Sequence, residues 1–202
     1  MSLRTFAADA ATADNRRVDV RLPHTIDDVL TVANTRHGSG AHRNVRVSHA
    51  AEAGPHDHLG DASDARQFLA DHGVAIPAGA PADESLEQLR VIRDLVHRLA
   101  DRRPGAARMA LAAVLSAAHY GLTTDGSIHS KDDGWPGFAQ SIAAATVPLL
   151  ERGERLRRCD NPACRWLFVD ESRRGDRRWC DMAVCGNRAK GTRYRHRRRV
   201  TA

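Results

Sequence analysis

The sequence predicts a mainly α N-terminal domain with a short β-hairpin, followed by a small α+β module that contains all four cysteines. Three observations support this fold class. Apolar residues recur at helical spacing through much of the first 150 residues, the cysteines fall within 27 consecutive residues, and the charge changes sign between the two parts. We place the boundary after Arg152, so the expected domains are 1–152 and 153–202, with residues 1–23 as a mobile lead-in.

The charge is distributed unevenly. Residues 1–150 contain 15 Lys and Arg against 18 Asp and Glu, a net charge of −3, whereas residues 151–202 contain 16 against 7, a net charge of +9. A basic quarter attached to an acidic body implies a polyanionic partner for that quarter. No stretch approaches the roughly 18–20 apolar residues of a membrane span, and the N-terminus lacks the apolar run of a secretory signal. We therefore expect a cytoplasmic protein.

Residues 25–60 predict a helix followed by a loop. Residues 25–35 have apolar positions at helical spacing, and Thr25 is placed to cap this helix. Residues 36–60 are rich in Gly and His and predict a long loop with a brief strand near 45–47. Within it, the histidines of HDH at 56–58, together with His42 and His49, are a candidate second metal site, although surface-loop histidines are the simpler interpretation.

Four further helices and a hairpin are expected before the boundary. Asp64 can cap a short helix that Gly73 ends. Residues 83–101 give the clearest amphipathic helix, because apolar residues recur every three or four positions. A more apolar helix, expected to be buried, follows at 108–120.

The segment 121–134 predicts the hairpin, since Asp125-Gly126 separates two short alternating runs. Residues 137–151 predict a final apolar helix despite Pro148.

The cysteines have the spacing of a metal site. The pattern is C-x4-C-x15-C-x4-C, formed by Cys159, Cys164, Cys180 and Cys185. Two short-range cysteine pairs separated by roughly 15 to 20 residues are typical of tetrahedral zinc, while disulfides and a redox or iron–sulfur role stay open as alternatives. Four sulfur ligands leave no open coordination position, so we expect one structural Zn²⁺ ion and no hydrolytic centre.

The module is too small to bury much apolar surface, and units of this size usually need a metal or disulfides. Loss of Cys180 is therefore expected to unfold it. Residues 166–170 predict a strand, followed by a basic turn at 171–178. Trp166, Phe168 and Trp179 could stack on nucleic acid, but we favour a role as the hydrophobic core around the zinc.

Residues 155–199 resemble the CGNR zinc finger family, which is named for a motif that stands here as Cys185-Gly186-Asn187-Arg188. The likeness includes the C-x4-C pairs, Arg178-Trp179-Cys180, Met182 and the basic continuation through Lys190. Residues 1–150 more weakly resemble the ABATE domain, through Asn34-Thr35 and LRVIRDLVHRL. The resemblance implies a bacterial, stress-linked transcription regulator with zinc on the four cysteines and a DNA-binding finger.

A basic helix is expected after the last cysteine pair. If the chain continues as a helix after Cys180, the zinc would hold its first turn. The candidate nucleic-acid contacts spread around all faces and leave no apolar stripe; they are Arg188, Lys190, Arg193, Arg195, Arg197, Arg198 and Arg199. Arg188 and Arg193 are the candidates for base edges, and the later arginines are candidates for phosphates.

The sequence thus favours a DNA-binding transcription regulator whose N-terminal domain senses a signal or forms a homodimer. The alternative is a zinc-stabilised RNA- or ribosome-associated binding protein, and a solvated basic tail without a partner is a third interpretation. An enzyme with a pocket in the helical domain is the least favoured hypothesis, because no serine, cysteine or histidine constellation suits nucleophilic chemistry.

Overall fold

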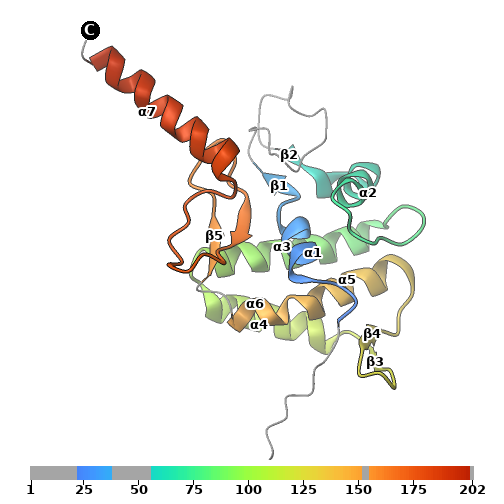
Figure 1. Cartoon of the computed structure of the whole chain (residues 1–202). Helices are drawn as coiled ribbons and strands as arrows, with labels where there is room; N and C mark the ends of the chain where they lie inside the picture. The colour runs from blue at the N-terminus through green and yellow to red at the C-terminus, as the bar shows by residue number, and fades with distance from the viewer. Residues whose placement is uncertain (1–21, 38–55, 152–154, 201–202) are drawn as a thin grey trace, which may run out of the picture.

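The computed structural model describes residues 22–37, 56–151 and 155–200. The helices of residues 26–151 form the N-terminal body, a hairpin at residues 156–169 lies against it, and a helix at residues 187–200 extends away from it (Figure 1). The expected mobile lead-in at 1–23 is described only at 22 and 23, and the expected strand at 45–47 lies outside the described residues, as does the proposed domain boundary. Within the part of the chain described, no helix is long and apolar enough to cross a membrane.

Two of the predicted helices are confirmed and form the centre of the body. Helix α1 (Ile26–Ala33) begins with a capping box, in which Asp28 N–H donates to Thr25 Oγ1 over 3.3 Å and Thr25 N–H donates to Asp28 Oδ2 over 2.8 Å. Helix α3 (Asp83–Ala100) buries the apolar stripe that the periodicity predicted. Helices α1, α4 (Pro104–Ser116) and α5 (Gly134–Ala145) all pack against α3, which is therefore the central helix of the core.

Helix α2 (Ala62–Asp71) begins earlier than the sequence indicated. Its cap is Asp61, which accepts hydrogen bonds from the backbone N–H groups of Ser63 and Asp64, both over 2.9 Å. The predicted cap at Asp64 is wrong because the carboxylate of Asp64 instead binds two histidines. Gly73 follows the helix with a φ of 78°, a left-handed conformation that suits glycine.

Helix α4 (Pro104–Ser116) starts at Pro104, a first-turn position where the missing N–H costs no hydrogen bond. The expectation that this helix is buried is wrong. Only Ala107 and Leu111 are buried, and Met109 is 77% exposed. Most residues of the helix are apolar, chiefly alanine, but only the stripe through Ala107 and Leu111 faces the core.

The hairpin is confirmed as β3 (Tyr120–Leu122) paired antiparallel with β4 (Ile128–Ser130), with Gly126 at a φ of 84° in the turn. The expected helix at 137–151 is two helices, α5 (Gly134–Ala145) and α6 (Val147–Glu151). The interruption has a physical cause, because Pro148 has no N–H to donate to the preceding turn.

The ends of the predicted loop at 36–60 are ordered. Strand β1 (Arg36–His37) pairs antiparallel with β2 (His56–Asp57), and β2 leads into a 3₁₀ turn, η2 (His58–Gly60). The loop interpretation is therefore wrong at both ends of the segment. The alternation rule missed these strands because each has only two residues.

The zinc module consists of β5 (Leu156–Arg158), β6 (Leu167–Val169), a π-helical turn η3 (Met182–Gly186) and α7 (Asn187–Val200). Strands β5 and β6 pair antiparallel. The module does not bury a separate core. Its buried Leu156, Leu167 and Phe168 belong to the same apolar cluster as the buried faces of α1 and α3.

Candidate metal centre and nucleic-acid interface

The four cysteine sulfurs lie close together. The Sγ atoms of Cys164 and Cys180 are 3.6 Å apart, those of Cys180 and Cys185 are 3.8 Å apart, and all four sulfurs lie within 4.8 Å of one another. A tetrahedral ion with Zn–S bonds of about 2.3 Å separates its sulfur ligands by about 3.8 Å. A disulfide needs an S–S distance of about 2.05 Å, and none of the four cysteines forms a disulfide. The cluster therefore fits one zinc ion and argues against the disulfide alternative.

Asn161 organises the turn between Cys159 and Cys164. Its backbone carbonyl accepts hydrogen bonds from the N–H groups of Cys164 and Arg165, over 2.9 and 3.1 Å. Its side-chain oxygen accepts from Ala163 N–H over 3.1 Å, and its Nδ2 donates to Cys185 Sγ over 3.5 Å. Asn161 thus fixes the two cysteine turns relative to each other, as residues around a metal's direct ligands commonly do. The sequence analysis did not single out this residue, although Asn-Pro ahead of a cysteine is a turn signal.

Asp181 plays the corresponding role in the second turn. Its side chain accepts from Val184 N–H over 2.9 Å, and its carbonyl accepts from the N–H groups of Cys185 and Gly186 over 2.9 and 3.1 Å. A Cβ at Gly186 would lie 2.4 Å from Met182 Sδ, so any larger residue here would displace the Met182 side chain. The turn continues directly into α7, so Cys180 and Cys185 do lie at the base of a helix, as the sequence predicted.

The thiols need a cation to ionise together. Hydrogen bonds from Cys164 and Cys180 lower the pKa of Cys159 to about 2. The bond with Cys159 in turn raises the pKa of Cys164 to about 12, and bonds to Cys159 and Cys164 raise the pKa of Cys180. Neighbouring thiolates repel one another, so a divalent cation is what lets all four bind as thiolates.

The aromatic residues behave mainly as core. Trp166 and Phe168 are each 8% exposed and Trp179 is partly buried, which favours the core interpretation over base stacking. The guanidinium of Arg177 lies 5.0 Å from the Phe168 ring, and that of Arg178 lies 5.1 Å from the Trp179 ring. These two arginines therefore cover the rings of Phe168 and Trp179.

Helix α7 places most of the predicted nucleic-acid residues on the surface. The exposed basic side chains are those of Arg188, Lys190, Arg193, Arg195, Arg197 and Arg198. Arg199 belongs to the same helix, but its side chain is not among those described. Figure 1 shows α7 extending beyond the body along most of its length.

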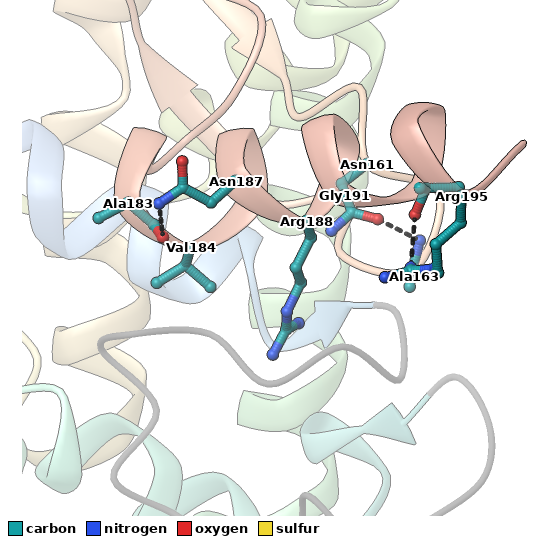
Figure 2. A pocket seen from close by; sticks show the side chains of 9 residues that line it. Asn161, Ala163, Ala183, Val184, Asn187, Arg188, Gly191 and Arg195 are labelled. Carbon is teal, nitrogen blue, oxygen red and sulfur yellow. Dashed lines mark hydrogen bonds between the residues drawn. The ribbon is translucent and has the colours of Figure 1, made fainter. Parts of the chain in front are cut away.

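The two base-edge candidates lie on different sides of α7. Arg188 and Arg195 line a groove between the helix and the first cysteine turn, opposite Asn161 and Ala163, and Figure 2 shows Arg188 extending on this side. Five residues at about 100° each place Arg193 about 140° away around the helix. Arg188 and Arg193 were both predicted to contact base edges, but the helix directs them to different sides.

The module is attached to the N-terminal domain by hydrogen bonds that the sequence analysis missed. The buried side chain of Asn34 donates to Leu167 O over 2.9 Å and accepts from Leu167 N–H over 2.7 Å, so it acts as a short strand partner for β6. Arg158 on β5 pairs with Asp101 over 2.9 Å and donates to Nδ1 of His97 over 2.9 Å.

His97 in turn donates to Ala33 O over 2.9 Å, which joins α1, α3 and β5. Burial lowers the pKa of His97 to about 4, and the Arg158 guanidinium adds to this effect. His97 is therefore a buried, hydrogen-bonded histidine at the junction between the two parts.

A second polar cluster lies beside β1 and β2. His58 is fully buried, and Asp64 contacts both His58 and His56. The interpretation of residues 56–58 as a surface loop is therefore wrong for His58, while His42 and His49 lie outside the described residues. Burial lowers the pKa of His58; burial alone would raise the pKa of Asp64, but hydrogen bonds from His58 and His56 lower it.

Comparison with known families agrees with the geometry. Residues 29–153 match the model of the ABATE family, described as "Putative stress-induced transcription regulator", and residues 155–198 match the CGNR zinc finger. No curated protein matches the chain. Neither family description is that of an enzyme. The chain belongs to the ABATE family and carries a CGNR zinc finger, whose four clustered cysteines can hold one zinc ion.

Proposed function

We propose that the protein is a cytoplasmic, DNA-binding transcription regulator of bacteria that acts in the stress response and has no enzymatic activity. The observation that carries this proposal is the exposed basic helix α7, which starts at the cysteine cluster and extends away from the body. The description of the ABATE family as a transcription regulator supports it. The four cysteines would bind one Zn²⁺ ion that fixes the start and direction of α7, and would take no part in hydrolysis.

One face of α7 is better placed for DNA than the other. Arg188 and Arg195 border the groove between α7 and the first cysteine turn. On this side of α7, the cysteine turn leaves less room for a DNA duplex. Lys190, Arg193 and Arg197 recur every three and four residues and share the opposite side of the helix. We therefore assign Arg193 to a base edge, and the other basic residues of α7, including Arg188, to phosphates.

The N-terminal domain, residues 1–152, would supply sensing or oligomerisation, and residues 153–202 would supply DNA contact. A homodimer formed through this domain would present two copies of α7. Two such helices would contact two half-sites on one duplex, as symmetric regulators commonly do.

Binding to duplex DNA and to hairpin RNA across a salt series tests the proposal. If about five phosphates are contacted, the slope of log K against log salt should be near about −4.5 on duplex DNA. Equal or tighter binding to the hairpin would favour the RNA- or ribosome-associated alternative. That alternative has one structural observation in its favour, because Tyr194 is 58% exposed and could stack on an unpaired base.

A charge-matched variant pair sharpens the experiment. Arg193→Ala should weaken binding by about 1–3 kcal/mol and relax the preference for a selected sequence. Arg108→Ala removes the same charge from an exposed position on α4 and should leave binding unchanged. Equal losses for the two variants would show that net charge alone drives binding, and would contradict the assignment of Arg193.

A further inference from the structure

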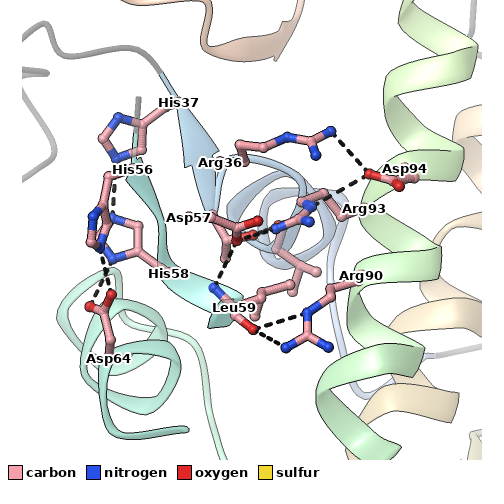
Figure 3. A network of polar contacts seen from close by, with 12 residues as sticks. Arg36, His37, His56, Asp57, His58, Leu59, Asp64, Arg90, Arg93 and Asp94 are labelled. Atoms are coloured by element: carbon pink, nitrogen blue, oxygen red, sulfur yellow. Dashed lines mark hydrogen bonds and ion pairs between the residues drawn. The ribbon is translucent and has the colours of Figure 1, made fainter. Parts of the chain in front are cut away.

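The cluster beside β1 and β2 gathers three histidines and one carboxylate from four different elements (Figure 3). His56 Nε2 lies 2.6 Å from Asp64 Oδ2, and His58 Nδ1 lies 2.8 Å from Asp64 Oδ1. His37 Nε2 lies 3.2 Å from His58 Nε2. One ligand atom each from His56, His58 and Asp64 can be chosen so that all lie within 4.8 Å of one another.

The surroundings hold these side chains in place. The ring of His58 stacks on Phe68, with 4.2 Å between ring centroids. The neighbouring Asp57 forms an ion pair with the buried Arg93 over 2.5 Å, and Arg90 donates to Leu59 O from both Nε and Nη2. Figure 3 shows these arginines reaching β2 and η2 from α3. The segment that carries His56 and His58 is therefore fixed to the central helix before any ligand binds.

We propose that His56, His58 and Asp64 form a second metal site, which binds a divalent first-row transition ion such as Zn²⁺ or Fe²⁺. Two imidazoles and one carboxylate are a ligand set that suits these ions and leaves coordination positions open. Metal–ligand bonds of about 2.0–2.1 Å separate tetrahedral ligand atoms by about 3.3 Å. For the ion to enter, Asp64 would need to withdraw by about 0.7 Å from His56 and by about 0.5 Å from His58, relative to the 2.6 and 2.8 Å contacts.

His37 would act as a positioning residue. Since His58 would bind the metal through Nδ1, its Nε2 would carry the proton and donate to His37 Nε2 over the observed 3.2 Å. A hydrogen bond on the second ring nitrogen is the usual device that fixes the tautomer and orientation of a metal-bound histidine. The side chains of His56 and Asp64 are 32% and 22% exposed, which leaves an entry path for the ion.

This site differs in chemistry from the cysteine cluster and does not depend on DNA binding. It lies close to the zinc module, because the ring of His37 is 5.8 Å from that of Trp166, two residues after Cys164. The ligand of the N-terminal domain would then be a divalent metal ion. A displacement of the His37 ring would therefore act on the zinc module through the neighbouring Trp166 ring.

Metal content of the full chain tests the proposal. The protein, purified under reductant and saturated with Zn²⁺ or Co²⁺, should retain two ions per chain after removal of weakly bound metal. With Co²⁺, one ion should show a thiolate charge-transfer band and the other should not, since only the cysteine site has sulfur ligands. Asp64→Asn should reduce retention from two ions to one and keep the thiolate band.

The thiolate site serves as an internal control for folding. Asp64 is not the cap of α2, so Asp64→Asn should preserve the helix, and His56→Gln provides a second variant at a partly exposed position. His119→Ala, at an exposed histidine, should still retain two ions. Retention of a single ion by the wild type, or of two ions by both site variants, would overturn the proposal; loss of the thiolate band would instead count against the cysteine site.

Discussion

The two halves of the zinc module are held in place by different neighbours. The β5–β6 hairpin lies against the N-terminal domain, with Leu156 and Leu167 at 1% and 0% exposure. Helix α7 extends away from the body, and all of its basic side chains that the structure describes are exposed (Figure 1). One stretch of about 45 residues therefore combines a packed hairpin with a helix that has little to pack against.

The difference shows which force orders each half. The hairpin has apolar burial and the hydrogen bonds of Asn34, so the N-terminal domain stabilises it independently of metal. A 14-residue helix rich in like charges is marginal in water by itself, and α7 has no apolar stripe. The turn η3, which contains Cys185 and follows Cys180, leads directly into α7, so a metal on these cysteines would fix the start of the helix. The metal should consequently control α7 more strongly than it controls β5 and β6.

Cys180→Ser gives the largest expected effect and separates the two halves. Zinc can contribute on the order of 10–16 kcal/mol in apparent terms to a structural site, and loss of one thiolate removes most of this. We expect α7 to lose its helical structure and DNA binding, while β6 stays paired with β5. Hydrogen exchange should show rapid exchange throughout 187–200 and retained protection of the Leu167 amide.

Ala183→Ser is the matched control, because it adds the same hydroxyl to an exposed position in the same turn. It should keep one zinc ion on the cysteines and full protection of α7. Loss of protection in β6 together with α7 after Cys180→Ser would restore the prediction from sequence that the whole module unfolds. Unchanged protection of α7 would show that the helix does not depend on the metal.

Asn34→Ala tests the other half. The substitution leaves the N–H and C=O groups of Leu167 without their buried partner, and each such group costs about 1–3 kcal/mol. We expect the free energy of unfolding of the zinc-loaded protein to fall by about 4 kcal/mol in denaturant titrations. The side chain of the exposed Asn187 donates to Ala183 O over 3.0 Å, within the same helical turn, so Asn187→Ala should cost less than about 0.5 kcal/mol. Equal small losses would show that Asn34 does not join the two parts.

The same contrast explains what could be predicted from the sequence. The cysteine spacing, the capped first helix and the 83–101 stripe are local patterns whose meaning depends on few neighbours, and the structure confirms them. The hairpin turn at Asp125-Gly126 is local in the same way. Such features depend on periodicity or on residues a few positions apart, which a sequence displays directly.

Features that depend on distant residues could not be predicted. Asn34 and Leu167 are 133 positions apart, and nothing in the local pattern of either residue indicates their pairing. Burial of His58 depends on Phe68 and on strands of two residues each, which are too short for a period. The α4 helix was expected to be buried because its composition is apolar, but composition does not show how much of a helix its neighbours can cover.

His97 offers the smallest and most specific test, through pH. It joins Ala33 O to Arg158, and burial lowers its pKa from 6.5 to about 4; the Arg158 and Arg36 guanidiniums also lower it, whereas Asp94 raises it. Above about pH 6.5 the histidine is neutral in both the folded and the unfolded chain. As the pH falls towards 4, the unfolded chain takes up the proton first, so the free energy of unfolding decreases. At about 1.4 kcal/mol per pKa unit, the loss reaches about 3 kcal/mol.

Protonation of the cysteine ligands also destabilises the protein in acid, so the informative quantity is a difference between variants. His97→Gln keeps a polar side chain that can reach one of the two partners but does not titrate, and its free energy of unfolding should fall less steeply between pH 6.5 and 4 than that of the wild type. His119→Gln, at an exposed histidine, should follow the wild-type curve. Because all three proteins share the same zinc ligands, acid release of zinc affects them equally. Parallel curves for the wild type and His97→Gln would show that the junction between the helical domain and β5 does not depend on a neutral His97.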